Sequence, residues 1–298
     1  MANDVYRRQV AGILSKQPWF VLNAATHYDL VISDNPAISH FYSFEANHQN
    51  GLAFAIPDGC VDIVFDCNSE QPSARVCGTT LEARCAQLQD HHRYFGVRFA
   101  FGVIPDFLNL AADQLVDHEI NLLELLPHAR EMIEQISNEP QVLAQSRLFE
   151  HFFRSFHNRQ PSALTLESMQ RICQHKGNIQ IQQLAEQTGR SRRTLHRQFI
   201  DDLGMSPKAF SRIVRCQSAV YDINHQQDVV FSALASDLGF SDQSHFLREF
   251  KKCVNATPAD YQGQVQQQDY LQRIRHFGHP SLITLQPGSL ASWPWHSA

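Results

Sequence analysis

The chain has 298 residues, with 25 lysines and arginines, 30 aspartates and glutamates and a formal net charge of −5. That length predicts about two domains, and 43% hydrophobic with 18% charged residues excludes a disordered polyelectrolyte. A net negative charge, taken for the whole chain, also argues against a nucleic-acid-binding protein.

The sequence contains no apolar run long enough for a membrane span, which needs about 18 residues or more. Its first residues lack the sustained apolar run of a signal peptide, so we expect a cytoplasmic protein. The seven cysteines include no CxxC pair. We therefore interpret them as buried, reduced thiols of a cytoplasmic protein. A redox sensor is the alternative, although no low-pKa context favours it.

Residues 1–125 are predicted to form a β-rich domain. Short runs of aromatic and β-branched residues alternate there with turn signals, and one such turn is Pro57-Asp58-Gly59. This pattern favours a sandwich or a small barrel. The predicted strands are 40–46, 51–56, 60–66, 75–80 and 93–101.

Residues 126–160 are predicted to form a helical segment, with helices at about 128–138 and 141–157. The second helix carries a wide apolar stripe at helical spacing, which includes Phe149, Phe152 and Phe153. Two interpretations stay open and are compatible. The stripe packs on its own domain, or it forms a dimerisation surface.

The polar stretch 158–162 ends near Pro161 and predicts a domain boundary. Helical patterns then continue, so we place an all-α domain at 161–263. Residues 264–298 are expected to form a C-terminal tail. The tail has a short amphipathic stretch and an irregular end at 285–298.

Residues 179–204 have the pattern of a helix-turn-helix unit. Leu184 and Ala185 are predicted to face the core, and Gly189 suits a turn that needs positive φ. Ser191 is a good N-cap for the following helix. On that helix Leu195 and Phe199 lie at i, i+4 and point inward, which leaves one face to Arg192, Arg193, His196 and Arg197.

The same pattern recurs at 229–252. Leu234, Ala235 and Gly239 repeat the core pair and turn glycine, and Phe246 and Phe250 repeat the inward pair. The second unit is one residue longer after its glycine, so either Asp242 or Ser241 is expected to cap its second helix. A single match to the helix-turn-helix pattern would be weak evidence, but two matches with the same core positions are strong evidence for this fold.

A helix from about Pro207 to Asn224 is predicted between the two units. It would span roughly 27 Å, close to the ~34 Å between successive major-groove faces of B-DNA. Charge is also unevenly distributed. Residues 190–215 carry a net +5, residues 161–263 a net +2, and the rest of the chain a net −7. The basic charge lies where contacts to DNA phosphates need it.

Residues 165–262 resemble the DNA-binding domain of the AraC/XylS family of bacterial transcription regulators, in particular at LGFSDQSHFLREFKKCVNATPADY (238–261). The resemblance implies that Arg193, His196 and Arg197 contact bases from the first unit. It implies the same for Gln243, Ser244, His245 and Arg248 from the second, with phosphate contact or plain surface placement as the alternative. Arginine pairs well with guanine and glutamine with adenine.

The N-terminal region resembles, more weakly, the sensor half of this family, a cupin-like barrel with a dimerising helical segment. A small-molecule effector pocket is the default expectation for such a domain. The candidate effector-binding residues are Asp58, Cys60, Asp62 and Arg98. The alternative for these four is turn chemistry and ordinary strand packing.

An alternative from a different functional class is a cupin-type metalloenzyme fused to a DNA-binding domain. It would need alternating histidines with a nearby glutamate, whereas His91 and His92 are adjacent, and no catalytic motif is present. We therefore predict an α+β, two-domain, homodimeric regulator without enzyme activity, metal or cofactor. It would bind double-stranded DNA and engage RNA polymerase, and would act as an activator under effector control. An effector-independent regulator, controlled by a protein partner or by its own abundance, is the alternative.

Overall fold

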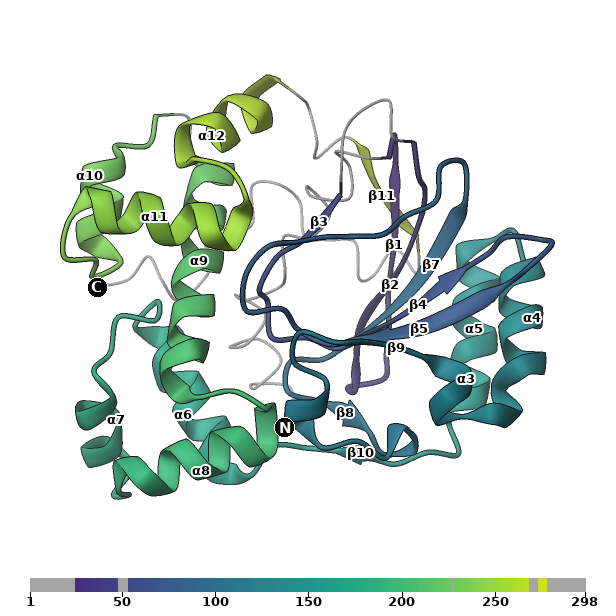
Figure 1. Ribbon diagram of the computed structural model, residues 1–298, viewed down its shortest axis with the longest axis horizontal. Coiled ribbons are helices and arrows are strands. Elements are labelled where there is room, and N and C mark those ends of the chain that lie inside the picture. The colour runs from purple at the N-terminus through teal and green to yellow at the C-terminus, as the bar shows by residue number, and fades with distance from the viewer. Residues whose placement is uncertain (1–24, 48–52, 227, 268–272, 278–298) are drawn as a thin grey trace.

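A computed structural model of the chain describes residues 25–47, 53–226, 228–267 and 273–277. Its N-terminal half is built on a mainly antiparallel sheet (Figure 1). The sheet has seven strands in the order β11-β1-β2-β7-β4-β5-β9. The strands are β1 (Tyr28–Ile32), β2 (Ile38–Glu45), β4 (Asp62–Asp66), β5 (Ser73–Cys77), β7 (Arg93–Phe99), β9 (Glu119–Asn121) and β11 (Ile274–Phe277).

Two short ribbons accompany this sheet. One pairs β3 (Phe54–Ala55) with β6 (Arg84–Cys85), and the other pairs β8 (Ile104–Pro105) with β10 (Asn158–Arg159). Within the described residues the end strands β9 and β11 do not pair with each other. The β-rich domain therefore exists as expected, with an open sheet in its described part.

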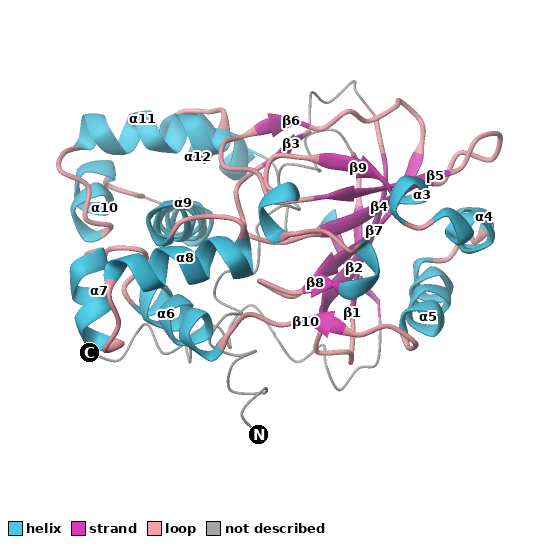
Figure 2. Cartoon of the chain, turned by 60° about the horizontal axis from the view of Figure 1, so that its bottom comes forward, coloured by secondary structure: helices cyan, strands magenta, loops and turns pink. Residues whose placement is uncertain are grey.

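Helices cover one face of the sheet. They are α3 (Leu122–Leu125), α4 (Arg130–Asn138) and α5 (Val142–Phe153), and they lie on the side away from the C-terminal helices (Figure 2). Phe149 of α5 is fully buried, with ring centroids 6.1 Å from Phe41 and 6.3 Å from Phe65. The apolar stripe of α5 therefore packs on its own domain.

The C-terminal half is all helical. It contains α6 (Ala163–Gln174), α7 (Ile181–Gln187), α8 (Arg192–Leu203), α9 (Pro207–His225), α10 (Phe231–Asp237), α11 (Gln243–Val254) and α12 (Pro258–Gln267). A β-rich half followed by this helical half confirms the predicted α+β class.

The polar stretch at 158–162 is more structured than a plain linker. Asn158 and Arg159 pair with β8, and the Ser162 side chain caps α6 by accepting a hydrogen bond from the Thr165 amide. Ser162 also donates to Asp202 of α8 over 2.7 Å. The connection is therefore anchored on both sides.

The end of the described chain returns to the N-terminal half. Strand β11 pairs in parallel with β1, with Tyr28 opposite Ile274, and Arg275 Nε lies 2.6 Å from Asp29 Oδ1. The sequence predicted no strand here. Our expectation for 285–298 falls outside the described residues.

Candidate DNA-binding site

The first helix-turn-helix unit has the predicted internal geometry. Leu184, Leu195 and Phe199 have no exposed surface, and Gly189 has a φ of 62°. The Ser191 hydroxyl accepts a hydrogen bond of 3.1 Å from the Thr194 amide, which caps α8. Packing and cap together fix which face of α8 points outward.

That outward face carries the predicted residues Arg192, Arg193, His196 and Arg197, all of which are exposed. Three guanidinium groups and an imidazole offer several donors in a planar or rotatable geometry. Such a face can contact guanine edges and phosphates in a major groove.

The second unit repeats this geometry. Phe246 and Phe250 are buried, and Gly239 has a φ of 71°. Asp242, rather than Ser241, provides the cap, since its Oδ1 accepts a hydrogen bond of 2.7 Å from the His245 amide.

The outward face of α11 has fewer positive charges than that of α8, and one of its predicted residues is less exposed. Gln243, Ser244 and Arg248 are exposed, whereas His245 is half-buried. The His245 ring lies 3.1 Å from the Ser241 hydroxyl and packs edge-on against Phe240. Of the four residues predicted here, His245 is therefore the least free to reach DNA.

Helix α9 holds the two units apart. It has 19 residues, which corresponds to about 28 Å. Phe210 and Ile213 pack into the core of the first unit, and Val220 and Ile223 pack into the core of the second. Because both cores share one helix, the two recognition helices are held in a defined relation.

Two of the basic residues counted around the first unit make contacts within the protein. Arg212 donates from Nη2 to the Leu81 carbonyl over 2.5 Å. Arg215 is half-buried over the Phe240 ring, and burial lowers its pKa despite the nearby Glu249. The local charge of +5 therefore overstates the basic surface, which is carried by Arg190, Arg192, Arg193, Arg197 and Lys208.

Comparison with known proteins agrees with this geometry. Residues 184–264 match the family described as a helix-turn-helix domain. An uncharacterised HTH-type transcriptional regulator from Haemophilus influenzae is 35% identical over 94 residues, which is 32% of this chain and 31% of the relative. The transcriptional activator RhaS from Escherichia coli is 35% identical over 77 residues, which is 26% of this chain and 27% of RhaS. Residues 184–264 therefore form a helix-turn-helix domain similar to those of these transcription regulators.

The chain spans less than a third of the length of these curated relatives. Residues 35–121 match a family described only as a domain of unknown function (DUF6597). Among solved structures, ToxT from Vibrio cholerae aligns with 81% of this chain and 93% of ToxT, at 14% identity and a TM-score of 0.37.

The N-terminal half contains the four predicted effector residues, and the structure brings them together. Arg98 of β7 binds Asp62 of β4 through Nε–Oδ1 at 2.8 Å and Nη2–Oδ2 at 2.5 Å. Its Nη1 lies 2.9 Å from Asp58 Oδ2. The Cys60 amide donates to Asp58 Oδ1 over 3.0 Å, and all four residues are buried.

This cluster is internally satisfied. Both carboxylates contact the guanidinium, and Asp62 also accepts a hydrogen bond from the Tyr42 hydroxyl. A crevice of about 20 Å³ lies nearby, lined by residues that include Gly59, Thr79 and Leu203. That volume is about the size needed for one water molecule. The alternative of turn chemistry and strand packing therefore accounts for the contacts of these residues.

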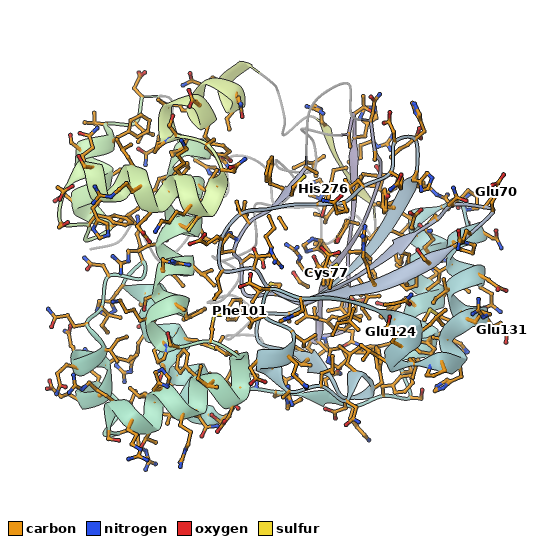
Figure 3. The ribbon with its side chains drawn as sticks, viewed as in Figure 1. Glu70, Cys77, Phe101, Glu124, Glu131 and His276 are labelled. Carbon is orange, nitrogen blue, oxygen red and sulfur yellow. The ribbon has the colours of Figure 1, made fainter. Side chains whose placement is uncertain are left out.

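Sequence reasoning missed the contacts between the two halves. Phe101 lies between the sheet and the C-terminal helices (Figure 3), with its ring 5.1 Å from that of Phe210 on α9. Gln217 of α9 donates to the Pro57 carbonyl, and the Ala83 amide donates to the Lys252 carbonyl at the end of α11. No local sequence pattern marks such pairs.

The first unit also contacts the N-terminal half closely. Gly204 ends α8 with a φ of 71°, and a side chain there would come within 2.4 Å of the Ala112 carbonyl oxygen. Glycine is therefore required by both conformation and space. The N-terminal half thus contacts both helix-turn-helix units and the helix that joins them.

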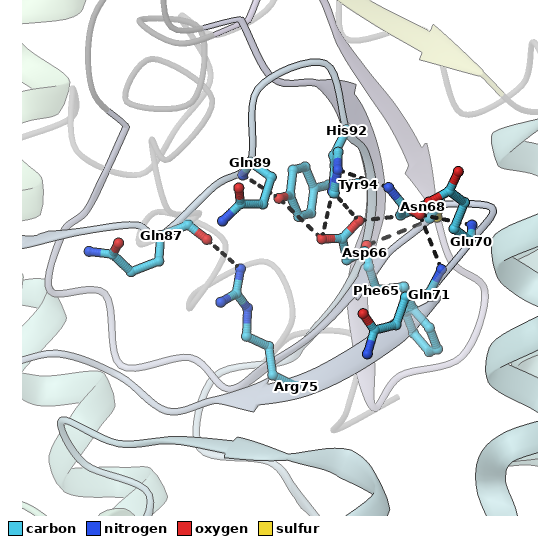
Figure 4. Close-up of polar contacts among 11 residues, drawn as sticks. Phe65, Asp66, Asn68, Glu70, Gln71, Arg75, Gln87, Gln89, His92 and Tyr94 are labelled. Atoms are coloured by element: carbon cyan, nitrogen blue, oxygen red, sulfur yellow. Dashed lines mark hydrogen bonds and ion pairs between the residues drawn. The ribbon is translucent and has the colours of Figure 1, made fainter.

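The histidines considered for a metal site have other partners. His91 and His92 precede β7, and His92 Nδ1 lies 2.9 Å from both carboxylate oxygens of Asp66 (Figure 4). Among the described residues no group of three or more His, Cys, Asp or Glu side chains is arranged to hold a metal. In the same part of the chain, no helix has both the length and the hydropathy to cross a membrane.

Proposed function

We propose that this chain is a sequence-specific regulator of transcription that binds double-stranded DNA through α8 and α11. One observation carries the proposal: two helix-turn-helix units expose polar faces while a single shared helix fixes their relation. Arg192, Arg193, His196 and Arg197 would read one major-groove segment. Gln243, Ser244, His245 and Arg248 would read the next, with a smaller electrostatic contribution because the second face has fewer cations.

Selection of duplexes from a random library tests this proposal. The expected result is a motif with two parts about 10–10.5 base pairs apart, the spacing of successive major-groove faces. Inserting about half a helical turn between the parts should abolish the contribution of one unit, because the two parts would then face opposite sides of the duplex. A motif with one part, or no enriched motif, would refute the two-unit mode.

We assign effector sensing to residues 1–125, a helical linking and dimerising segment to 126–160, DNA binding to 161–263 and a tail to 264–298. An effector would act by favouring one arrangement of the two halves. The contacts from Phe101, Pro57 and Ala83 to the helices supply a physical route for this. The cytoplasm is the compartment we assign to such a regulator.

The activating role is proposed because the related RhaS is named a transcriptional activator. Activation would require contact with RNA polymerase, and binding as a homodimer would add a second DNA-binding copy. In vitro transcription from a selected site should increase on adding the protein. A decrease would identify a repressor instead.

A second candidate is a regulator that needs no small molecule. It is favoured by the satisfied contacts of Asp58, Asp62 and Arg98 and by the small size of the nearby crevice. Mass spectrometry of the native protein distinguishes the two candidates. A retained small molecule supports effector control, and ligand-free protein with full DNA affinity supports control by a partner or by abundance.

A further inference from the structure

The two helix-turn-helix units contact each other directly, at the turn of the second unit. A side chain in place of Gly239 would overlap the side-chain amide of Asn178, which lies just before α7 of the first unit. The Asn178 amide group therefore packs on the backbone of Gly239. Since Gly239 also has a φ of 71°, both conformation and space require glycine there. This contact joins the two units by a path that does not run through α9.

The segment that presents Asn178 is a closed turn at the end of α6. Lys176 and Gly177 have left-handed φ values of 48° and 78°. The Gly177 amide donates to the Ile172 carbonyl over 2.8 Å, and the Asn178 amide donates to the His175 carbonyl over 2.7 Å. A turn closed by such bonds fixes the direction in which the next residue leaves the helix. Because α6 packs into the core of the first unit, Asn178 is fixed to that unit.

The same turn also packs on α9. Lys176 Nζ lies 3.4 Å from Asp222 Oδ2. A side chain at Gly177 would overlap the Ser211 carbonyl and would come within 2.9 Å of Arg215 Cγ. The first unit is therefore in close contact with α9 at the point where the Arg215 side chain begins.

Arg215 extends this contact into the second unit. Its guanidinium carbon lies 5.2 Å from the centre of the Phe240 ring, which is within the range of a cation–π interaction. Phe240 follows Gly239 and packs on the beginning of α11, with its ring centre 5.3 Å from that of His245 and 5.3 Å from that of Phe246. A shift of Gly239 and Phe240 would therefore move the start of the second recognition helix.

We propose that Asn178 and Arg215 are positioning residues that determine which spacing between the two parts of a DNA motif the protein accepts. Asn178 packs on Gly239 and Arg215 packs on Phe240, so together they fix the start of α11 relative to the first unit. Neither side chain has to contact DNA for this role. The inference rests on the proposed function, because a spacing matters only if both units bind the same duplex.

DNA geometry makes this role measurable. One base pair inserted between the two parts of the motif separates them by about 3.4 Å more and rotates them by about 35°. Two units in a fixed relation lose base contacts on such a duplex, so the affinity of the wild-type chain should fall about tenfold or more. Without either positioning contact the second unit can follow the change, and this penalty should shrink about threefold or more.

The test measures binding of the full-length chain to the selected duplex and to the duplex with one inserted base pair, by fluorescence anisotropy. The readout is the ratio of the two dissociation constants, which a uniform loss of affinity or of folded protein does not change. Asn178→Ala and Arg215→Met should each lower this ratio. Asn178→Asp keeps the planar group and should keep the ratio, although its negative charge lowers affinity for both duplexes. Gln174→Ala removes an exposed amide at the end of α6 and is the matched control with an unchanged ratio.

A second measurement needs no DNA. The amides of Gly239 and Phe240 each donate to a backbone carbonyl over 2.9 Å, which protects them from hydrogen exchange. Exchange followed by mass spectrometry on the peptide 238–245 should be faster in Asn178→Ala than in the wild-type chain. Gln174→Ala should exchange at the wild-type rate.

The outcomes separate this inference from the proposed function. An unchanged ratio in Asn178→Ala and Arg215→Met would overturn the positioning role, and so would a wild-type ratio near one on a two-part motif. Unchanged exchange in Asn178→Ala would show that its contact does not hold the turn of the second unit. Selection of a one-part motif would refute the proposed two-unit mode, and hydrogen exchange would then decide whether Asn178 holds that turn.

Discussion

Gln217 Nε2 donates a hydrogen bond of 2.7 Å to the carbonyl oxygen of Pro57, 160 residues away in the sequence. The bond joins the middle of α9 to the turn that precedes β4, and Gln217 is buried. The helix that sets the spacing of the two DNA-binding units is thus fixed to the N-terminal half.

Gln217→Leu should weaken this connection. It leaves the Pro57 carbonyl without its partner, which costs about 1–3 kcal/mol when the group is buried. The free energy of unfolding in urea measures the loss. Gln183→Leu, at an exposed position on α7, is the control and should stay within about 0.5 kcal/mol of the wild-type chain. Equal stability of both variants would show that the bond contributes nothing.

Arg98→Met should be strongly destabilising. It leaves the buried carboxylates of Asp58 and Asp62 without a cation, at a cost of about 3–5 kcal/mol. Adding Asp58→Asn and Asp62→Asn should recover part of the loss. Arg75→Met is the control, because Arg75 of β5 is partly exposed and paired with Glu119, and such ion pairs contribute about 1 kcal/mol or less. Thermal unfolding is measured for the wild-type chain, Arg98→Met, Arg98→Met with both asparagine substitutions, and Arg75→Met. Similar melting points for Arg98→Met and Arg75→Met would contradict a structural role for the cluster.

Arg197→Ala should reduce affinity for the selected duplex by about 1–3 kcal/mol if the guanidinium binds a guanine edge. The loss should be largest for sequences that carry the contacted base. Arg171→Ala removes a partly exposed arginine paired with Glu167 on α6, and its affinity should be unchanged. Wild-type affinity of the Arg197 variant would remove this residue from the DNA-reading face.

Acid should destabilise the fold through His40. Burial, with repulsion from Arg98 and His276, lowers the pKa of His40 from 6.5 to about 3. The unfolded chain therefore binds a proton below pH 6.5 while the folded chain does not, so stability falls as the pH falls through this window. The expected loss is about 1 kcal/mol between pH 6.5 and about 5.5.

His40→Gln should remove that part of the pH dependence. His151→Gln, at an exposed position on α5, should retain it. Urea unfolding at the two pH values measures both. Identical pH dependence in the His40 variant and the wild-type chain would show that His40 titrates normally in the folded protein.

The helix-turn-helix domain was predictable because its signals are local. Inward pairs such as Leu195 and Phe199 lie one helical turn apart, and the capping role of Ser191 depends on residues within three positions. The exposed faces of α8 and α11 follow from that spacing. His245 is less exposed than its helical position predicts, because its ring packs on Phe240.

Contacts between distant segments were not predictable. Strand β11 joins β1 through backbone pairing, and residues 274–277 carry no distinctive strand pattern. Arg212 was counted as basic surface, yet it binds the Leu81 carbonyl 131 residues away. Charge counting along the sequence cannot detect a partner that only the tertiary fold supplies.

The candidate effector residues were predictable only in part. Asp62 and Arg98 were chosen as polar residues in the β-rich domain, and the register of β4 against β7 places them directly opposite each other. The sequence contained both residue types. It did not contain the register, which determines that they satisfy each other.

The affinity of the reduced full-length protein for its selected duplex, compared with a scrambled duplex of the same composition, tests the central claim most directly. Specific recognition predicts binding at least about 10³-fold tighter to the selected sequence at physiological salt. Equal affinity for the two duplexes would contradict the account.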